Sequence, residues 1–107
     1  MSRSSQRKGR AGELELVKVL QGYGFEDVQA GEPVSYGSTP DLVGLPGVHV
    51  EVKRCEQLRL PEWMRQAQRD AERFQDGVPV IFHRKNREPW LVTLRLDDFI
   101  EIYRRNE

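Results

Sequence analysis

The segment that decides the fold is Pro40-Asp-Leu-Val-Gly-Leu-Pro-Gly-Val-His-Val-Glu-Val-Lys-Arg54. Its second half alternates strictly, because valine occupies every second position from 48 to 52 and polar residues lie between. Its first half, up to Leu45, predicts a short strand, and Pro46-Gly47 is typical of a tight turn. Two strands joined in this way form a β-hairpin. The segment therefore predicts part of a β-sheet.

Helical and strand patterns alternate along the rest of the chain. Residues 10–23 predict an amphipathic helix that ends at Gly22 and Gly24, and Pro61 opens a second helix that ends at Asp76-Gly77. Residues 78–84 and 90–96 predict two more strands, and Asp97 is the predicted N-cap of a last helix. Residues 1–9 are polar and basic, and we expect a flexible arm there. This order predicts a sheet with helices packed on it, in the α/β or α+β class.

Length and composition exclude several classes of protein. The chain has 107 residues, which predicts a single domain over residues 1–107. One cysteine excludes an intramolecular disulfide framework and a cysteine-rich zinc module. The longest apolar run, Val78–Phe82, is too short for a membrane helix, and the basic N-terminus lacks the apolar stretch of a secretory signal. We expect a cytoplasmic protein that does not enter a membrane.

The charge balance gives two opposing indications. Lysine plus arginine and aspartate plus glutamate both number 17, and zero net charge taken alone argues against a nucleic-acid binder. However, 13 of the basic residues are arginine, whose planar fork suits phosphate. Genomic base composition is the alternative explanation for the arginine excess. Net charge alone therefore does not decide the partner.

The candidate catalytic and metal-binding residues lie on the polar face of the alternating strand. Glu51 and Lys53 are two residues apart and point the same way, and the hairpin brings Asp41 beside them. Carboxylates are the ligands that Mg²⁺ selects, and a lysine beside a metal can orient or deprotonate a water. The alternative interpretation is a solvent-facing ion pair between Glu51 and Lys53. The first interpretation predicts metal-assisted hydrolysis of a phosphodiester.

Two motifs extend this interpretation to a family. Pro40-Asp41, followed ten residues later by Glu51-Val52-Lys53, resembles the Pro-Asp…(Asp/Glu)-x-Lys nuclease superfamily. The run from Lys8 to Val17 resembles the N-terminal motif of archaeal-type Holliday junction resolvases and related phage-encoded endonucleases. The resemblance extends from about Lys8 to Arg105. It implies a restriction-endonuclease-like α/β fold with three layers, in which helices flank a central mixed β-sheet.

The resemblance also implies an activity and the residues that carry it. Glu13, Asp41 and Glu51 would ligate one or two Mg²⁺ or Mn²⁺ ions together with the backbone carbonyl of Val52, and Lys53 would position or activate the water. The implied reaction is cleavage of DNA, preferably branched or Holliday-junction DNA, to a 5′-phosphate and a 3′-hydroxyl, with no organic cofactor. Two symmetric cuts in a junction imply a homodimer.

Six residues are predicted to contact DNA. They are Arg7, Lys8, Arg10, Ser38, Gln66 and Arg69. Two of these assignments have an alternative nearby: Ser35 qualifies as well as Ser38, and Gln68 is the alternative to Gln66, which is preferred because it borders the apolar stripe of its helix. Arg69 belongs to a row of arginines that is also explained as a solvated helix face. His49 is either a metal ligand or a partly buried neighbour of Glu51.

Other functions remain open from the sequence. The same superfamily contains restriction-like, flap and nicking nucleases, and a domain of this fold can bind DNA without cleaving it. The intact set of Glu13, Asp41, Glu51 and Lys53 argues against the non-cleaving module. If the three acids bind metal, the basic residues exceed the remaining acids by three, so a neutral chain still has a positive surface for DNA.

Overall fold

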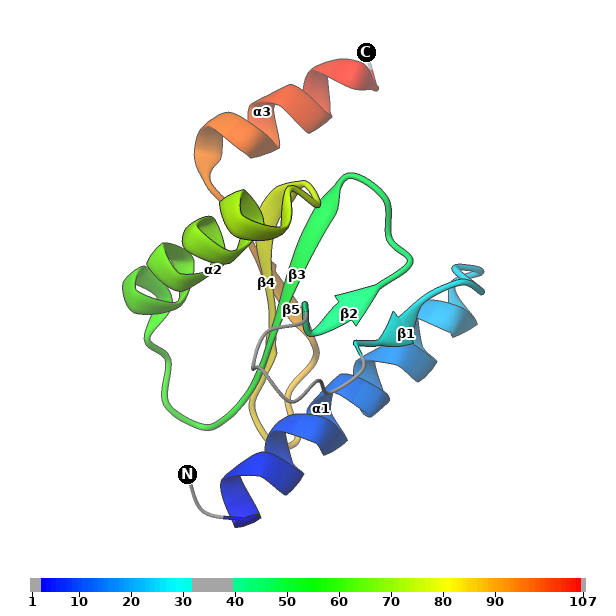
Figure 1. Ribbon diagram of the computed structural model, residues 1–107, viewed down its shortest axis with the longest axis vertical. Helices are drawn as coiled ribbons and strands as arrows, with labels where there is room; N and C mark the ends of the chain where they lie inside the picture. Colours follow the sequence, from blue (N-terminus) through cyan, green and yellow to red (C-terminus); the bar gives the residue numbers. More distant parts are fainter. Residues whose placement is uncertain (1–2, 32–39, 107) are drawn as a thin grey trace.

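The computed structural model describes residues 3–31 and 40–106, with side chains from Gly9 onward (Figure 1). The elements follow the predicted order of helix, strands, helix, strands, helix. They are α1 (Arg3–Gly22), β1 (Gln29–Ala30), β2 (Leu42–Val43), β3 (Val48–Arg54), α2 (Leu60–Phe74), β4 (Val78–Arg84), β5 (Leu91–Thr93) and α3 (Leu96–Arg105).

One mixed sheet contains the five strands in the order β1-β2-β3-β4-β5. The predicted hairpin is confirmed, because β2 and β3 are antiparallel with Leu42 opposite Val50. β3 and β4 are parallel along their whole lengths, from Val48 opposite Val78 to Arg54 opposite Arg84. The long central strand β3 therefore has a neighbour on each side, which places its side chains in the middle of the molecule.

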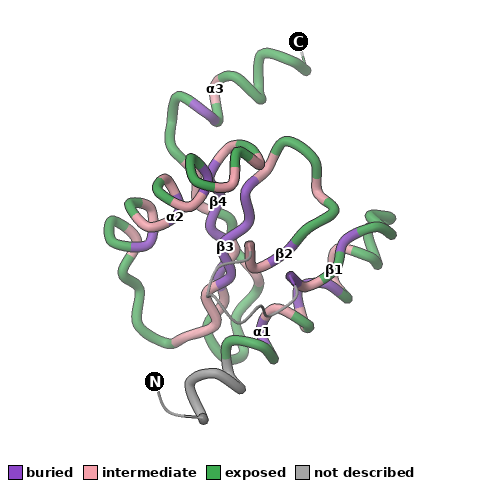
Figure 2. Tube along the Cα trace, viewed as in Figure 1, coloured by how far each residue is buried: buried purple, intermediate pink, exposed green. Residues whose placement is uncertain are grey.

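Two helices cover the two faces of the sheet (Figure 1). The valines of β3 form one buried cluster with Leu16 and Val17 of α1. On the other face, Trp63 and Ala67 of α2 pack on Ile81 of β4. The purple, buried part of the trace runs along β3 and β4 between these layers (Figure 2). The predicted α/β architecture, with a central mixed sheet between helices, is confirmed.

The polar face of β3 points toward α2 and away from solvent. His49 is 0% exposed and Glu51 only 4% exposed. The interpretation of Glu51 and Lys53 as a solvent-facing ion pair is therefore wrong. Alternation identifies two faces of a strand, but a helix from elsewhere in the chain decides which face meets water.

α1 begins earlier than predicted. It starts at Arg3, so the prediction of a flexible arm is wrong from that residue onward. The segment before Arg10 contains arginine, lysine and glutamine, which have good helix propensity, and no proline interrupts it. Residues 3–9 contain no apolar side chain, so a search for apolar periodicity does not detect this part of the helix. The predicted end of the helix at Gly22 is confirmed.

α3 also starts differently from the prediction, and it lies beyond the end of the sheet (Figure 1). Its N-cap is Arg95 and not Asp97, because Leu96 already has helical geometry. Asp97 and Asp98 occupy the first turn, where acidic side chains complement the helix dipole. No helix in the described part of the chain is long and apolar enough to cross a membrane.

Candidate active site

His49 holds Glu51 in place under α2. The Nε2 atom of His49 lies 3.1 Å from Oε1 of Glu51, and its Nδ1 atom lies 2.9 Å from both carboxylate oxygens of Asp76. When Glu51 and Asp76 are ionised they only accept hydrogen bonds, so both ring nitrogens then donate and the ring is an imidazolium. Burial alone would lower the pKa of His49, but the hydrogen bonds to Glu51 and Asp76 raise it to about 9. Glu51 thus has a buried cation beside it.

Asp41 is fixed to the same strand through the backbone. Its Oδ2 atom accepts a hydrogen bond of 2.8 Å from the N–H of Val52. Burial raises the pKa of Asp41, while this hydrogen bond and the charge of Lys53 act in the opposite direction. The turn before β2 therefore places the Asp41 carboxylate beside β3, as the hairpin predicted.

Glu13 reaches the same region from α1. Burial and then the charge of Asp41 raise the pKa of Glu13 to about 7, against an opposing effect of Arg10 and with a smaller contribution from Glu51. The pKa of Glu51 is also raised, by burial and by Asp41, while its hydrogen bond to His49 lowers it. Carboxylates influence one another in this way only when they are close. Glu13, Asp41 and Glu51 therefore lie in one region, although the group of described residues whose ligand atoms lie within 4.8 Å of one another is His49, Glu51 and Asp70.

Two contacts set the position of α1 over the sheet. A Cβ atom on Gly12 would lie 2.7 Å from the Cβ of Arg54, so the helix backbone approaches β3 very closely there. Next to it, Glu15 accepts hydrogen bonds from Arg54, at 3.4 Å, and from Arg84. These arginines are the last residues of β3 and β4. α1 is therefore docked across the carboxyl ends of both strands, with Glu13 next to the contact.

Lys53 points from β3 to α2. Its Nζ atom donates a hydrogen bond of 3.2 Å to Oε1 of Gln66. Of the two glutamines left open by the sequence, the structure brings Gln66 to the site. Gln68 instead lines a shallow hollow on another side of α2, with Ala71 and Pro79. The ammonium of Lys53 is thus held in one place by a neutral acceptor.

Sequence reasoning missed two acids around Glu51. Polar atoms of His49, Glu51 and Asp70 lie within 4.8 Å of one another, and Asp76 holds the far side of the His49 ring. The available signal for Asp70 was its position four residues after Gln66, on the same face of α2. Asp76 was interpreted only as part of a helix stop, because the fold and not the spacing brings it to His49.

The structure describes only some of the residues that were predicted to contact DNA. Arg10 donates a hydrogen bond of 3.1 Å from Nη1 to the carbonyl of Gly31 and lies 3.9 Å from Glu13, so it is partly engaged within the protein. Arg69 is exposed on α2. The side chains of Arg7 and Lys8, and both candidate serines within residues 32–39, lie outside the described residues.

Comparison with protein families gives a match that covers nearly the whole chain. A family described as "Phage putative PDDEXK endonuclease" matches residues 4–107, a range that includes all the carboxylates described above. Comparisons with curated proteins and with solved structures gave no match. The family match identifies a nuclease. The chain belongs to this family of phage PDDEXK endonucleases.

Proposed function

We propose that the protein is a divalent-metal-dependent endonuclease that hydrolyses DNA phosphodiester bonds with Glu13, Asp41, Glu51 and Lys53. One observation carries the proposal. The Asp41 carboxylate, in the turn before β2, contributes to the raised pKa values of Glu13 on α1 and Glu51 on β3, and Lys53 follows on the same face of β3. Such a concentration of acids is unfavourable unless positive charge compensates it; His49 and Lys53 do so in part, and a bound metal ion would add to the compensation.

The donor set fits a hard cation such as Mg²⁺ or Mn²⁺. Glu13, Asp41 and Glu51 supply carboxylate oxygens, and we propose the carbonyl of Val52 as a further ligand. When bound, the ion would polarise the phosphate and lower the pKa of a water. His49 is near enough to Glu51 and Asp70 to be considered a ligand, but a protonated ring nitrogen has no lone pair to give. We therefore assign His49 to positioning Glu51.

The remaining side chains act on the substrate and on one another. The ammonium of Lys53, oriented by Gln66, positions the attacking water and stabilises negative charge on the phosphate. Attack at phosphorus with the 3′-oxygen leaving gives a 5′-phosphate and a 3′-hydroxyl. The imidazolium of His49 favours the ionised form of Glu51, which is the form that binds a cation.

The substrate and the assembly are parts of the same proposal. We infer that branched DNA, including the four-way junction, is the preferred substrate, and that a homodimer makes two symmetric cuts. Arg7, Lys8, Arg10, Ser38, Gln66 and Arg69 are the proposed DNA contacts. Arg69 supports this best, because it is exposed on α2, the helix that also carries Gln66. The resemblance of the N-terminal motif to resolvases supports the junction preference.

A cleavage assay tests the proposal directly. Labelled four-way junction, flap and linear duplex DNA are incubated with Mg²⁺ and with wild type, Lys53→Ala or the matched control Lys18→Ala. We expect the junction to be cut fastest, and Lys53→Ala to lower the rate by about 10²-fold or more. Lys18 is exposed on α1, so its replacement leaves the rate unchanged.

Two outcomes would contradict the proposal in different ways. Equal cleavage of the three DNAs would remove the preference for junctions and favour a restriction-like, flap or nicking enzyme. No cleavage of any DNA would favour a DNA-binding module. Mn²⁺ binding that survives both Asp41→Ala and Glu51→Ala would contradict the metal site itself.

A further inference from the structure

The last helix, α3, exposes apolar side chains that nothing in the described chain covers. Leu96 is 74% exposed and Tyr103 is 58% exposed, and Phe99 is also exposed. The helix projects beyond the sheet and is drawn almost wholly in the colour of exposed residues (Figure 2). A helix of 10 residues is marginal in water unless its apolar face packs against another surface. This face therefore indicates an interaction.

Three exposed apolar residues and the half-buried Ile100 form one stripe, while the exposed Ile102 lies on another side of the helix. Leu96, Phe99, Ile100 and Tyr103 follow the i, i+3, i+4, i+7 spacing that places side chains on one face of a helix, and we call them the α3 stripe. Asp98 lies on a different side of the helix, where it is buried and accepts a hydrogen bond of 2.9 Å from Arg95. The helix thus turns Asp98 toward the protein and the stripe toward solvent.

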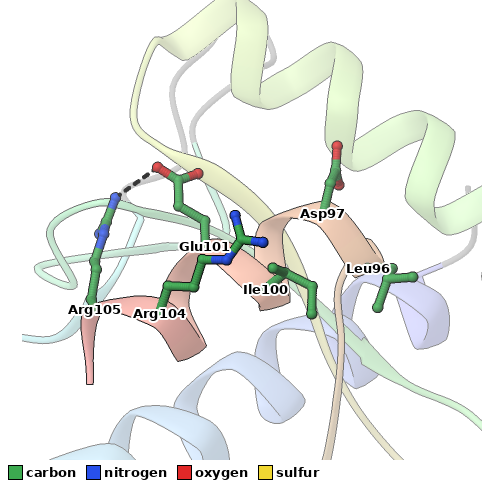
Figure 3. A pocket seen from close by; sticks show the side chains of 6 residues that line it. All are labelled: Leu96, Asp97, Ile100, Glu101, Arg104 and Arg105. Carbon is green, nitrogen blue, oxygen red and sulfur yellow. Dashed lines mark hydrogen bonds and ion pairs between the residues drawn. The ribbon is translucent and has the colours of Figure 1, made fainter. Parts of the chain in front are cut away.

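Opposite charges flank the stripe at its two ends. Asp97 lies near the start of α3, and Arg104 lies seven residues later on the same side of the helix. An open depression runs along this side, and all of its lining residues come from α3 (Figure 3). Arg105 already pairs with Glu101 at 3.1 Å, and Asp97 lies 3.8 Å from Arg95 but keeps an exposed carboxylate. One end of the flank is therefore acidic and the other basic.

We propose that the α3 stripe binds α3 of a second copy of the chain, with the two helices antiparallel about a two-fold axis near Ile100. In this arrangement Asp97 lies opposite Arg104 of the partner subunit, and the symmetric pair forms at the other end. A parallel arrangement would place each acid opposite the same acid. An antiparallel contact is also isologous, so it closes as a dimer. The proposal specifies the surface of the homodimer proposed above.

The size of the surface sets the strength of the dimer. One face of a ten-residue helix buries less than the roughly 800 Å² per partner of a standard interface. The contact is therefore weak, and we expect the dimer fraction to rise with concentration over roughly 1–500 µM.

Sedimentation velocity of the full chain measures this without DNA or metal, so its result is independent of cleavage. We expect wild type to dimerise and Ile100→Glu to stay monomeric at every concentration. The control is Leu91→Glu, because Leu91 is another exposed apolar residue, on β5, and its variant should dimerise like wild type. Thermal unfolding checks that both variants are folded. A monomeric wild type would overturn the proposal and indicate a different protein partner for the stripe. Loss of the dimer in Leu91→Glu alone would overturn it in favour of the β5 edge.

A charge exchange tests the antiparallel geometry. Asp97→Arg and Arg104→Asp each place like charges opposite one another at both ends, so each variant alone dimerises about ten-fold more weakly. An equimolar mixture of the two variants forms heterodimers in which both pairs are attractive again, so we expect wild-type dimerisation to return. A mixture that stays as weak as its components would overturn the antiparallel pairing.

Discussion

His49 and His83 lie on the same face of the sheet, but their surroundings have opposite effects on their charge. His49 is placed between two carboxylates, whose hydrogen bonds outweigh its burial and raise its pKa to about 9. His83 packs against the Trp63 ring at 5.9 Å and has the hydroxyl of Thr93 at 2.8 Å as its polar contact. Burial lowers the pKa of His83. The first ring positions an acid, whereas the second belongs to the core.

The lowered pKa of His83 predicts a pH dependence of stability. In the unfolded chain a histidine titrates near pH 6.5, so below about that pH the unfolded state binds a proton that the folded state does not. The free energy of unfolding therefore falls as the pH drops below this value. In His83→Gln the amide can still hydrogen-bond to Thr93 but cannot bind a proton, so this part of the pH dependence is lost.

Denaturant unfolding of both proteins between about pH 8 and pH 5 measures this effect. We expect the stability advantage of wild type over His83→Gln to shrink as the pH falls. The carboxylates of the site titrate in both proteins, so their contribution cancels in the difference. A difference that stays constant across the range would show that His83 has the same pKa in the folded and unfolded states.

At the scale of elements, the contact between α1 and β3 determines where Glu13 lies. Gly12→Ala places a methyl group against Arg54 and pushes the helix away from the strand. We expect a loss of about 1–3 kcal/mol in the free energy of unfolding and a lower cleavage rate, because Glu13 moves with the helix. Gly9→Ala is the matched control, since no atom lies within 4 Å of a Cβ at that position.

The control should stabilise the protein, by about 0.5–1 kcal/mol, because alanine is the better helix former. Thermal unfolding and the cleavage assay compare the two variants in one experiment. If Gly12→Ala behaved like Gly9→Ala in both measurements, the close approach of α1 to β3 would not control the site.

The sequence predicted those elements whose signal is local. The alternation of valines in β3 and the Pro46-Gly47 turn identify the hairpin, and the stripe that contains Trp63 identifies α2. It did not predict that α2 covers the polar face of β3, because periodicity shows that a face exists but not which element packs on it. Asp70 and Asp76 reach Glu51 and His49 only through that packing, so they were missed as neighbours of the site.

Across the whole molecule the net charge is zero, but carboxylates are concentrated around β3. Glu13 has a pKa of about 7 because of its burial and of Asp41 nearby. Between the usual glutamate pKa and about pH 7, the folded state thus holds a proton that the unfolded state has lost. The free energy of unfolding decreases as the pH rises through this range. The metal-free protein is therefore under electrostatic repulsion at neutral pH, and a cation can relieve it.

This repulsion predicts that divalent metal stabilises the fold. A Mg²⁺ or Mn²⁺ concentration about ten times the Kd adds about 1.4 kcal/mol and raises the unfolding midpoint by roughly 5–10 °C. Asp41→Asn retains an acceptor for the N–H of Val52 but removes the ligand charge, so we expect most of the shift to be lost. The matched control is Asp27→Asn, at an exposed position outside the site. Thermal unfolding with and without metal at pH about 7.5, above the pKa of Glu13, compares the three proteins. An equal shift in Asp41→Asn and wild type would mean that the metal binds elsewhere, because a site built on Asp41 cannot lose that charge without losing affinity.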